Sequence, residues 1–191
     1  QIQDPKKTKN ISWNFWEHKL VPTVEFGKGR INTLKNFLEI EKPKKILLLR
    51  GEKSYSFFAK RANEIVECDF VSFVMSAPNI SLEYLRQGIK FYEENNCDLV
   101  LAIGGGSVID MGKLISIFSV NRAPIQEYIT GKRSYKKRSN KLITIPTTAG
   151  SGSEATCFAV VYDGITKYSV AHQSLLPDYS IIDPELTYSL S

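Results

Sequence analysis

The stretch "LVLAIGGGSVIDMGK", residues 99–113, decides how this sequence folds. An apolar run of strand character ends in three glycines and a serine, and apolar residues then recur at helical spacing. Consecutive glycines at a strand end cost backbone entropy on folding, so something should offset that cost. The pattern predicts a buried strand, a turn where a ligand approaches the backbone closely, and a helix. A tight turn that binds nothing is the alternative interpretation.

The rest of the chain repeats this alternation of strand and helix. Short apolar runs predict strands at residues 44–51, 69–77, 97–106 and 141–148, and amphipathic patterns predict helices at 31–40, 54–67, 81–96 and 107–119. Strands that alternate with helices are typical of a parallel sheet with right-handed crossovers. We therefore expect an α/β fold, in which a Rossmann-like parallel sheet is flanked by helices.

Further strands are predicted outside this core. Residues 13–30 alternate apolar and polar side chains around Pro22, which favours a pair of edge strands. Residues 156–172 read as two strands joined by an Asp-Gly turn, and residues 178–183 as one more strand. These β-hairpin additions extend the predicted sheet domain.

Composition limits the class of protein. The chain has 191 residues, 42% hydrophobic and 24% charged, as in an ordinary globular domain. Its apolar stretches are shorter than the ~20 residues that span a bilayer, so we expect no membrane association. Cys68, Cys97 and Cys157 form no C-x-x-C pair, which favours reduced thiols in a cytoplasmic protein.

The net charge of +5 is concentrated in one segment. Residues 131–141 carry six Lys or Arg residues and no acid. A solvated loop between buried elements is the favoured interpretation, and a phosphate or nucleic-acid patch is the alternative. Tyr135 is the one aromatic residue there, too little for base stacking, so we expect no nucleic-acid partner.

A second small-residue turn follows the predicted strand at 141–148. Residues 144–156, "TIPTTAGSGSEAT", gather hydroxyls and glycines directly after that strand. Because the carboxyl ends of parallel strands lie at one edge of a sheet, this turn should lie beside the glycine turn. A helix N-terminus at that edge receives phosphate well. The two turns predict a cleft for a long polar ligand, and a serine-rich surface loop is the alternative.

These stretches resemble a known family. "GGGSVIDMGK" and "IPTTAGSGSEAT" look like the two signature stretches of the iron-containing (group III) alcohol dehydrogenases, and "VEFGKGRINTL", "APNIS" and "IIDPELTYSLS" extend the likeness along most of the chain. Glycerol dehydrogenase and dehydroquinate synthase share the glycine turn, but "PTTAGSGSE" favours the alcohol dehydrogenases. The resemblance implies a dehydroquinate synthase-like N-terminal domain that binds NAD or NADP.

The resemblance also implies cofactor-binding residues. Gly104, Gly105, Gly106 and Ser107 would hold the pyrophosphate, Asn79 would lie near the adenosine, and Thr147, Thr148, Thr156, Val160 and Lys167 would line the nicotinamide side. Asp110, on the helix after the glycines, joins this candidate set. From the spacing alone, Asp110 and Lys113 can form an ion pair at i and i+3.

One departure from the family bears on cofactor choice. Many NAD-preferring members resemble one another in having an aspartate after the first apolar strand, where this chain has Gly51. Without that carboxylate, a 2′-phosphate meets no repulsion. Arg50, Lys53 and Ser54 lie nearby to receive it, whereas Glu52 favours NAD. We expect NADP(H) to be preferred, or both cofactors to be accepted.

A second departure concerns the metal. In the family, one aspartate and three histidines of a C-terminal helical domain hold iron, sometimes zinc. Here His18 and His172 lie far apart with no D-x-x-x-H or H-x-x-x-H pair, and His172 fits a surface or ribose-side position better than a ligand. We therefore expect residues 1–191 to be the nucleotide-binding half alone, with no metal site and no catalysis without the helical domain.

The leading hypothesis is the cofactor domain of a metal-dependent dehydrogenase. The full-length family would transfer hydride between the nicotinamide and a small alcohol or aldehyde, as a homo-oligomer. The same half of a glycerol dehydrogenase or dehydroquinate synthase-type enzyme is one alternative. A non-catalytic nucleotide-binding module, whose basic segment 132–141 docks an acidic partner, is another.

Overall fold

The computed structural model describes residues 21–52, 58 and 66–188. The elements in chain order are β1 (Thr23–Phe26), η2 (Arg30–Asn32), α1 (Thr33–Glu41), β2 (Ile46–Gly51), β3 (Phe70–Met75), α3 (Leu82–Glu94), β4 (Leu99–Gly104), α4 (Gly106–Phe118), α5 (Ile125–Ile129), β5 (Lys141–Pro146), η3 (Ser153–Ala155), β6 (Phe158–Asp163), β7 (Thr166–Ala171), η4 (Gln173–Leu175), β8 (Tyr179–Ile182) and η5 (Pro184–Thr187). The predicted helix at 54–67 and the first of the two predicted edge strands lie almost wholly outside the described residues.

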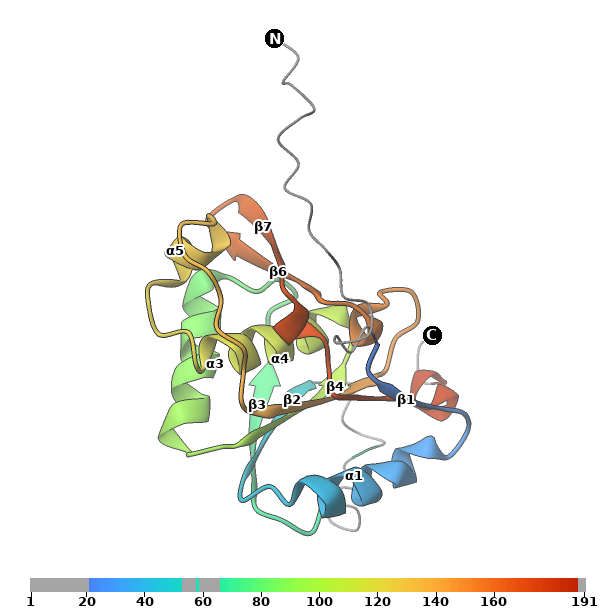
Figure 1. Ribbon diagram of the computed structural model, residues 1–191. Coiled ribbons are helices and arrows are strands. Elements are labelled where there is room, and N and C mark those ends of the chain that lie inside the picture. Colours follow the sequence, from blue (N-terminus) through green and yellow to red (C-terminus); the bar gives the residue numbers. More distant parts are fainter. Residues whose placement is uncertain (1–20, 53–57, 59–65, 189–191) are drawn as a thin grey trace, which may run out of the picture.

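A parallel sheet organises the described residues. Six strands follow the order β1-β8-β5-β4-β2-β3, and every pair of neighbours is parallel. Helices α3 and α4 cover one face, and α1 covers the other (Figure 1). The predicted α/β fold with a parallel sheet is confirmed. The edge strand predicted after Pro22 is β1, which pairs with β8 at one end of the sheet.

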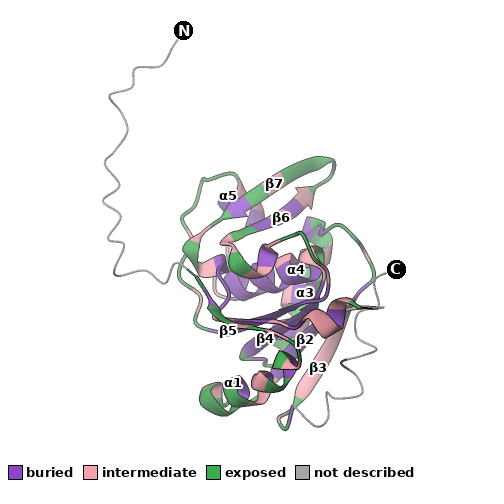
Figure 2. Ribbon diagram, turned by 90° about the vertical axis from the view of Figure 1, so that its right-hand side faces the viewer, coloured by how far each residue is buried: buried purple, intermediate pink, exposed green. Residues whose placement is uncertain are grey.

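The strand at the centre of the sheet explains the apolar run in the opening stretch. All six residues of β4 are buried, because helices cover both faces of the sheet. Figure 2 shows buried residues concentrated in the sheet and in α4. Helix α4 packs closely on β4 because Gly112 has no side chain, and a Cβ there would lie 2.9 Å from the Cβ of Ala102. This close packing fixes the position of the helix that follows the glycines.

The helix predicted at 81–96 also forms. Ser81 caps α3, and its Oγ accepts a hydrogen bond from the N–H of Tyr84 at 3.1 Å. The predicted hairpin is present as β6 and β7, which pair in antiparallel register from Phe158 opposite Ala171 to Asp163 opposite Thr166. Gly164 supplies the left-handed conformation that this tight turn requires, with φ 58°.

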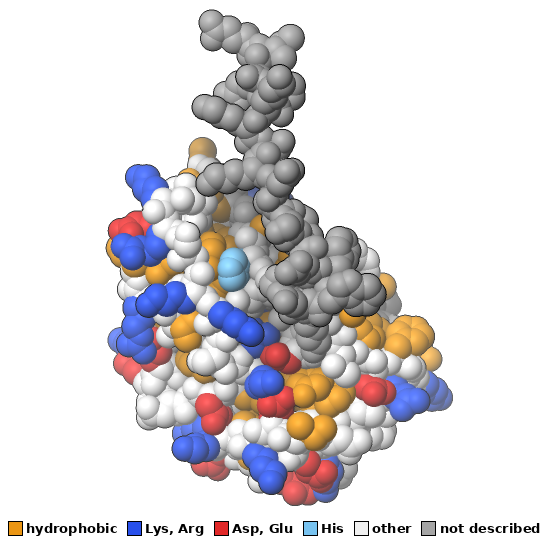
Figure 3. Space-filling model, in the orientation of Figure 1, with side chains coloured by type: hydrophobic (Ala, Val, Ile, Leu, Met, Phe, Trp, Pro, Cys, Tyr) orange, Lys and Arg blue, Asp and Glu red, His pale blue; other side chains and the backbone are white. Residues whose placement is uncertain are grey.

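The basic segment 131–141 connects α5 to β5, as the interpretation of a loop predicts. One of its residues departs from the expectation of solvation. The Arg138 guanidinium is buried, donates to the carbonyls of Ser174 and Leu176 at 2.8 Å each, and pairs with Asp178 at 2.7 Å. Arg138 therefore joins the loop to the segment before β8. Over the face in Figure 3, Lys and Arg side chains are interspersed with Asp and Glu.

Candidate functional site

The two small-residue turns meet at the carboxyl edge of the sheet. Gly104 ends β4 and lies opposite Pro146, which ends the neighbouring strand β5. The N–H of Thr147 donates to the Gly104 carbonyl at 3.0 Å, so the backbones of the two turns are directly bonded. The prediction that both turns lie at one edge is confirmed.

The glycine turn presents backbone donors instead of side chains. Gly105 precedes α4 in an extended conformation, and no side chain caps the helix. Its carbonyl accepts from the N–H groups of Val108 and Ile109. By helix geometry, the N–H groups of Gly106 and Ser107 have no partner within the helix. They carry the positive end of the helix dipole, which is suited to an anion.

The two turns lie close together because Gly105 and Gly106 have no side chains. A Cβ on Gly105 would lie 3.3 Å from the Thr148 hydroxyl oxygen, and one on Gly106 would lie 2.9 Å from the Cβ of Ser151. Side chains at these positions would press against the second turn. The backbone at the start of α4, here called the cradle, therefore carries bare N–H groups at Gly106 and Ser107, a chemistry that suits an anion such as a pyrophosphate.

Ser107 has a role that its sequence position did not indicate. Its hydroxyl donates to the carbonyl of Pro78 at 2.7 Å, which joins the start of α4 to the loop between β3 and α3. Ser107 does not cap the helix, which begins without a side-chain cap. The bond brings the loop that contains Asn79 to the edge of the cradle.

A cavity of about 250 Å³ joins residues from three segments. Six of the predicted cofactor-binding residues line it: Asn79, Gly106, Ser107, Asp110, Val160 and Lys167. They come from the β3–α3 loop, the start of α4 and the β6–β7 hairpin. The fold thus assembles a cleft from positions as far apart in the chain as Pro78 and Lys167.

The expected bond between Asp110 and Lys113 is replaced by bonds to another segment. One carboxylate oxygen of Asp110 accepts from the Ser153 hydroxyl at 2.5 Å, and the other accepts from the N–H of Val160 at 3.0 Å. Asp110 satisfies two donors of the chain itself, because the segment after the second turn folds back over α4. It forms part of the cavity wall by holding that segment.

Lys113 lies beneath the same segment with 0% of its surface exposed. Its Nζ donates to the Thr156 hydroxyl at 3.2 Å and to the Phe158 carbonyl at 2.8 Å. Burial lowers the pKa of Lys113 to about 8, and the nearby Asp110 carboxylate opposes part of that shift. Lys113 is a site residue that was not predicted from sequence, although its place within "MGKLISIF", among apolar residues, is a signal of burial.

The other predicted residues are distributed around this cleft. Thr147 is buried and Thr148 is half-buried beside Gly105, whereas the Thr156 hydroxyl faces Lys113. Gly51 ends β2 directly after Arg50, which is in register with Ile103 of β4. Lys53 and Ser54 lie outside the described residues.

Two further residues considered from sequence have structural partners. Nε of Arg50 donates to Ser72 of β3 at 2.9 Å. His172 begins η4, and its Nδ1 accepts from the N–H of Ser174 at 3.1 Å. Burial lowers the pKa of His172, which favours the neutral ring that this bond requires.

The described residues do not fit a metal ion. In residues 21–52, 58 and 66–188, no three His, Cys, Asp or Glu side chains gather closely enough to ligate one. Within the same residues, no helix combines the length and apolar character needed to cross a bilayer.

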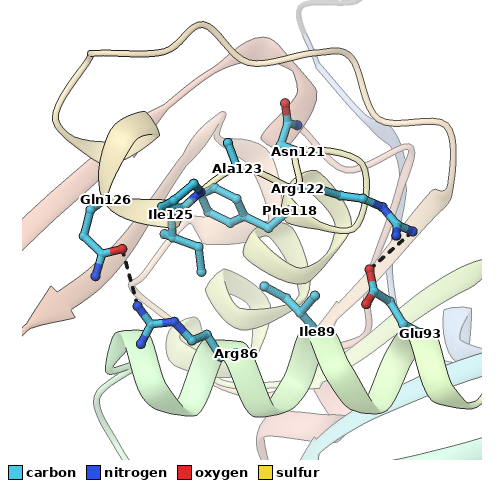
Figure 4. Close-up of a pocket in the computed structure, with 10 residues that line it drawn as sticks. Arg86, Ile89, Glu93, Phe118, Asn121, Arg122, Ala123, Ile125 and Gln126 are labelled. Carbon is cyan, nitrogen blue, oxygen red and sulfur yellow. Dashed lines mark hydrogen bonds and ion pairs between the residues drawn. The ribbon is translucent and has the colours of Figure 1, made fainter.

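A larger cavity, of about 520 Å³, lies at the opposite end of α4 from the glycine turn. Ile89, Phe118 and Ile125 form its apolar part, and Arg86 and Arg122 lie at its rim (Figure 4). These guanidinium groups contact Gln126 and Glu93, respectively. The cavity has no glycine turn, and the helix end that lines it belongs to the five-residue α5, with Pro124 at its N-cap.

Comparison with known proteins gives the family. The model of the iron-containing alcohol dehydrogenases matches residues 22–184. This chain belongs to that family. It is 32% identical, over 92% of its length, to NADH-dependent butanol dehydrogenase B of Clostridium acetobutylicum, and 30% identical, over 86%, to the NAD-dependent methanol dehydrogenase of Bacillus methanolicus. It spans 46% and 45% of those proteins, respectively.

Solved structures of the family share the fold. Sulfoacetaldehyde reductase from Bifidobacterium kashiwanohense, determined in complex with NAD+, superposes with a TM-score of 0.82 at 28% identity. That match covers 92% of this chain and 48% of the reductase. The iron-containing alcohol dehydrogenase from Thermococcus thioreducens also gives 0.82, at 25% identity, over 91% of this chain and 48% of its own. This chain thus spans about half the length of these relatives.

Proposed function

We propose that this chain binds a nicotinamide dinucleotide in the cleft between the two turns, as the nucleotide-binding domain of an alcohol or aldehyde oxidoreductase. The observation that carries the proposal is the start of α4, where Gly106 and Ser107, whose N–H groups have no partner within the helix, line a cavity of about 250 Å³. Relatives named as NAD- or NADH-dependent support the same assignment. The domain corresponds to residues 1–191.

Different residues of the cleft would bind different parts of the dinucleotide. The N–H groups of Gly106 and Ser107 would donate to the pyrophosphate, and Asn79 would lie toward the adenosine. Val160 and Lys167 line the cavity from the hairpin and would face the nicotinamide and its ribose. When bound, the nicotinamide ring supplies the site that accepts or gives hydride. The protein's part is to hold and orient that ring and to keep water from it.

A titration of the chain with NADH, followed by nicotinamide fluorescence, tests this proposal. Gly105→Val places a branched side chain against Thr148, because a Cβ there lies 3.3 Å from the hydroxyl oxygen. We expect the variant to fold and to bind NADH at least about tenfold more weakly, since charge-assisted hydrogen bonds of ~1.5–3 kcal/mol are lost.

Gly131→Ala is the matched control. Gly131 has φ +74° and lies on an exposed loop with no atom near its Cβ position, so alanine adds backbone strain without entering the cleft. Saturable NADH binding that Gly105→Val reduces and Gly131→Ala preserves supports the proposal. Wild-type chain that binds no NADH, or Gly105→Val that binds as well as wild type, contradicts it.

We propose further that NADPH is accepted as well as NADH. Gly51 carries no carboxylate at the end of β2, so a 2′-phosphate near this position meets no fixed negative charge from it. Gly51→Asp introduces that charge. We expect the variant to lose about tenfold or more in NADPH affinity through like-charge repulsion, with NADH affinity kept or improved. Parallel titrations measure the ratio, and an unchanged ratio refutes the role of Gly51.

A further inference from the structure

Lys113 is a buried charged group that the assignment of cofactor-binding residues does not use. It lies in the second turn of α4, among residues that are buried against the sheet and the hairpin. A buried ammonium group costs free energy unless its donors are satisfied. Two of its three donors are satisfied by one short segment, at Thr156 and Phe158. The structure therefore connects this charge to a single neighbouring element.

That segment forms a wall of the cleft. It runs from η3 into β6, and Val160 on it lines the cavity. Asp110 bonds the segment at Ser153 and Val160, and Lys113 bonds it between those points. The four hydrogen bonds all come from two side chains, one helical turn apart on α4. The same helix begins with the glycine cradle. Helix α4 therefore forms one wall of the cleft and is hydrogen-bonded to the other.

The first residue of this strand is only partly buried. The side chain of Phe158 is largely exposed, with 52% of the residue surface accessible. Burial becomes complete only at Ala159 and Val161, which point toward the core. At the start of β6, the Cys157 carbonyl accepts from the N–H of His172, and Nζ of Lys113 donates to the Phe158 carbonyl and joins the strand to α4. Lys113 therefore contributes to the position of residues 156–158 relative to α4.

We propose that Lys113 is a positioning residue, whose ammonium group fixes residues 156–158 and thereby the nicotinamide side of the cleft. The inference rests on the proposed function, because it takes the cleft to be a dinucleotide site. It makes no claim that Lys113 touches the cofactor. Its expected effect is confined to the part of the ligand that lies against β6, and the pyrophosphate cradle should be unaffected.

Comparing the binding of ADP-ribose with that of NADH distinguishes effects on the pyrophosphate side of the site from effects on the nicotinamide side. ADP-ribose contains the adenosine and pyrophosphate but has no nicotinamide. Lys113→Met keeps the length and apolar stem of the side chain and removes its donors. We expect this variant to bind NADH about tenfold more weakly, as for a lost hydrogen bond to a charged group, and to bind ADP-ribose as wild type does.

A pH profile provides a readout that a merely structural role would not produce. Because burial lowers the pKa of Lys113 to about 8, its charge is lost as pH rises through that value. We expect NADH affinity of the wild type to fall several-fold between about pH 7 and 9.5 as the charge-assisted bonds weaken, and that of Lys113→Met to stay flat. The titratable groups around Lys113 are Asp110 on the same helix, Glu154 in η3 and Cys157 before β6. Cys157→Ser should keep the wild-type profile.

The outcomes distinguish the two proposals. Wild-type chain that binds neither ligand overturns the dinucleotide site itself. Equal losses of NADH and ADP-ribose in Lys113→Met, or no loss of either, overturn the positioning role and leave the site intact. If Lys113→Met fails to fold, titrations of the wild type at different pH values decide. NADH affinity that falls between about pH 7 and 9.5 while ADP-ribose affinity stays constant supports the role, and equal changes in the two affinities, or no change in either, overturn it.

Discussion

The two halves of helix α4 differ in the groups that they bury: the first half buries polar and charged groups, and the second half buries mainly apolar side chains. Residues 106–113 include Gly106, Ser107 and Asp110, which line the cleft, and the buried ammonium group of Lys113 beneath its wall. Residues 114–118 are mostly apolar, and Leu114, Ile115 and Ile117 are fully buried in the core. Burying polar groups in the first half destabilises the fold, and burying apolar side chains in the second half stabilises it. A site at the start of a core helix can therefore tolerate unfavourable groups.

The largest expected effect is a loss of stability from a substitution in the second half of α4. Leu114→Ala leaves a cavity in the core, so we expect the free energy of unfolding to fall by about 4 kcal/mol. Urea denaturation measures this change, and Leu114→Met, which conserves volume, is the control with a loss below about 1.5 kcal/mol. At temperatures where the variant is folded, its NADH affinity should equal that of the wild type. Selective loss of NADH affinity would show that the two halves are not separable.

A smaller expected effect is a pH dependence of stability caused by Lys113 in the first half of α4. Lys113 has a lowered pKa of about 8 in the folded chain, against the ordinary value of 10.5. Below about pH 8 both states hold the proton, and the full cost of burying the charge is present. Between about pH 8 and 10.5 only the unfolded state holds it, so this cost is relieved and stability rises with pH.

Urea denaturation from pH 7 to 10.5 tests this sign. The free energy of unfolding of the wild type, minus that of Lys113→Met, should rise by roughly 2–3 kcal/mol across the range. Taking the difference removes other groups that titrate there, such as Cys97, whose pKa burial raises to about 11. NADH affinity of the wild type is expected to fall over the same range. A difference that stays constant or falls with pH contradicts the buried ammonium.

Most of the fold could be predicted from sequence because its signals are local. The apolar run of β4, the cap at Ser81 and the Asp-Gly turn before Ile165 each indicate their element without reference to distant residues. The shared edge of the two turns follows from the parallel sheet alone. Helix α5 was not predicted, since its five residues are too few for a periodic pattern.

The connections made by polar side chains could not be predicted. A charged residue on a helix is ordinarily solvated or paired within the helix, so Asp110 and Lys113 were expected to pair with each other. Their partners, from Ser153 to Val160, lie about 40–50 residues away and meet α4 only once the hairpin packs on it. The same holds for Ser107 and the Pro78 carbonyl. Such contacts depend on tertiary structure, which spacing does not encode.

Backbone amide chemical shifts of the chain, recorded during titration with NADH, test the central claim most directly. The two ends of α4 offer two different cavities, and the shifts report which one the dinucleotide enters. We predict the largest changes at Gly106, Ser107 and Thr148, with little change at Phe118 and Arg122. Changes concentrated at Phe118 and Arg122, with the glycine turn unaffected, would contradict the assignment of this cleft.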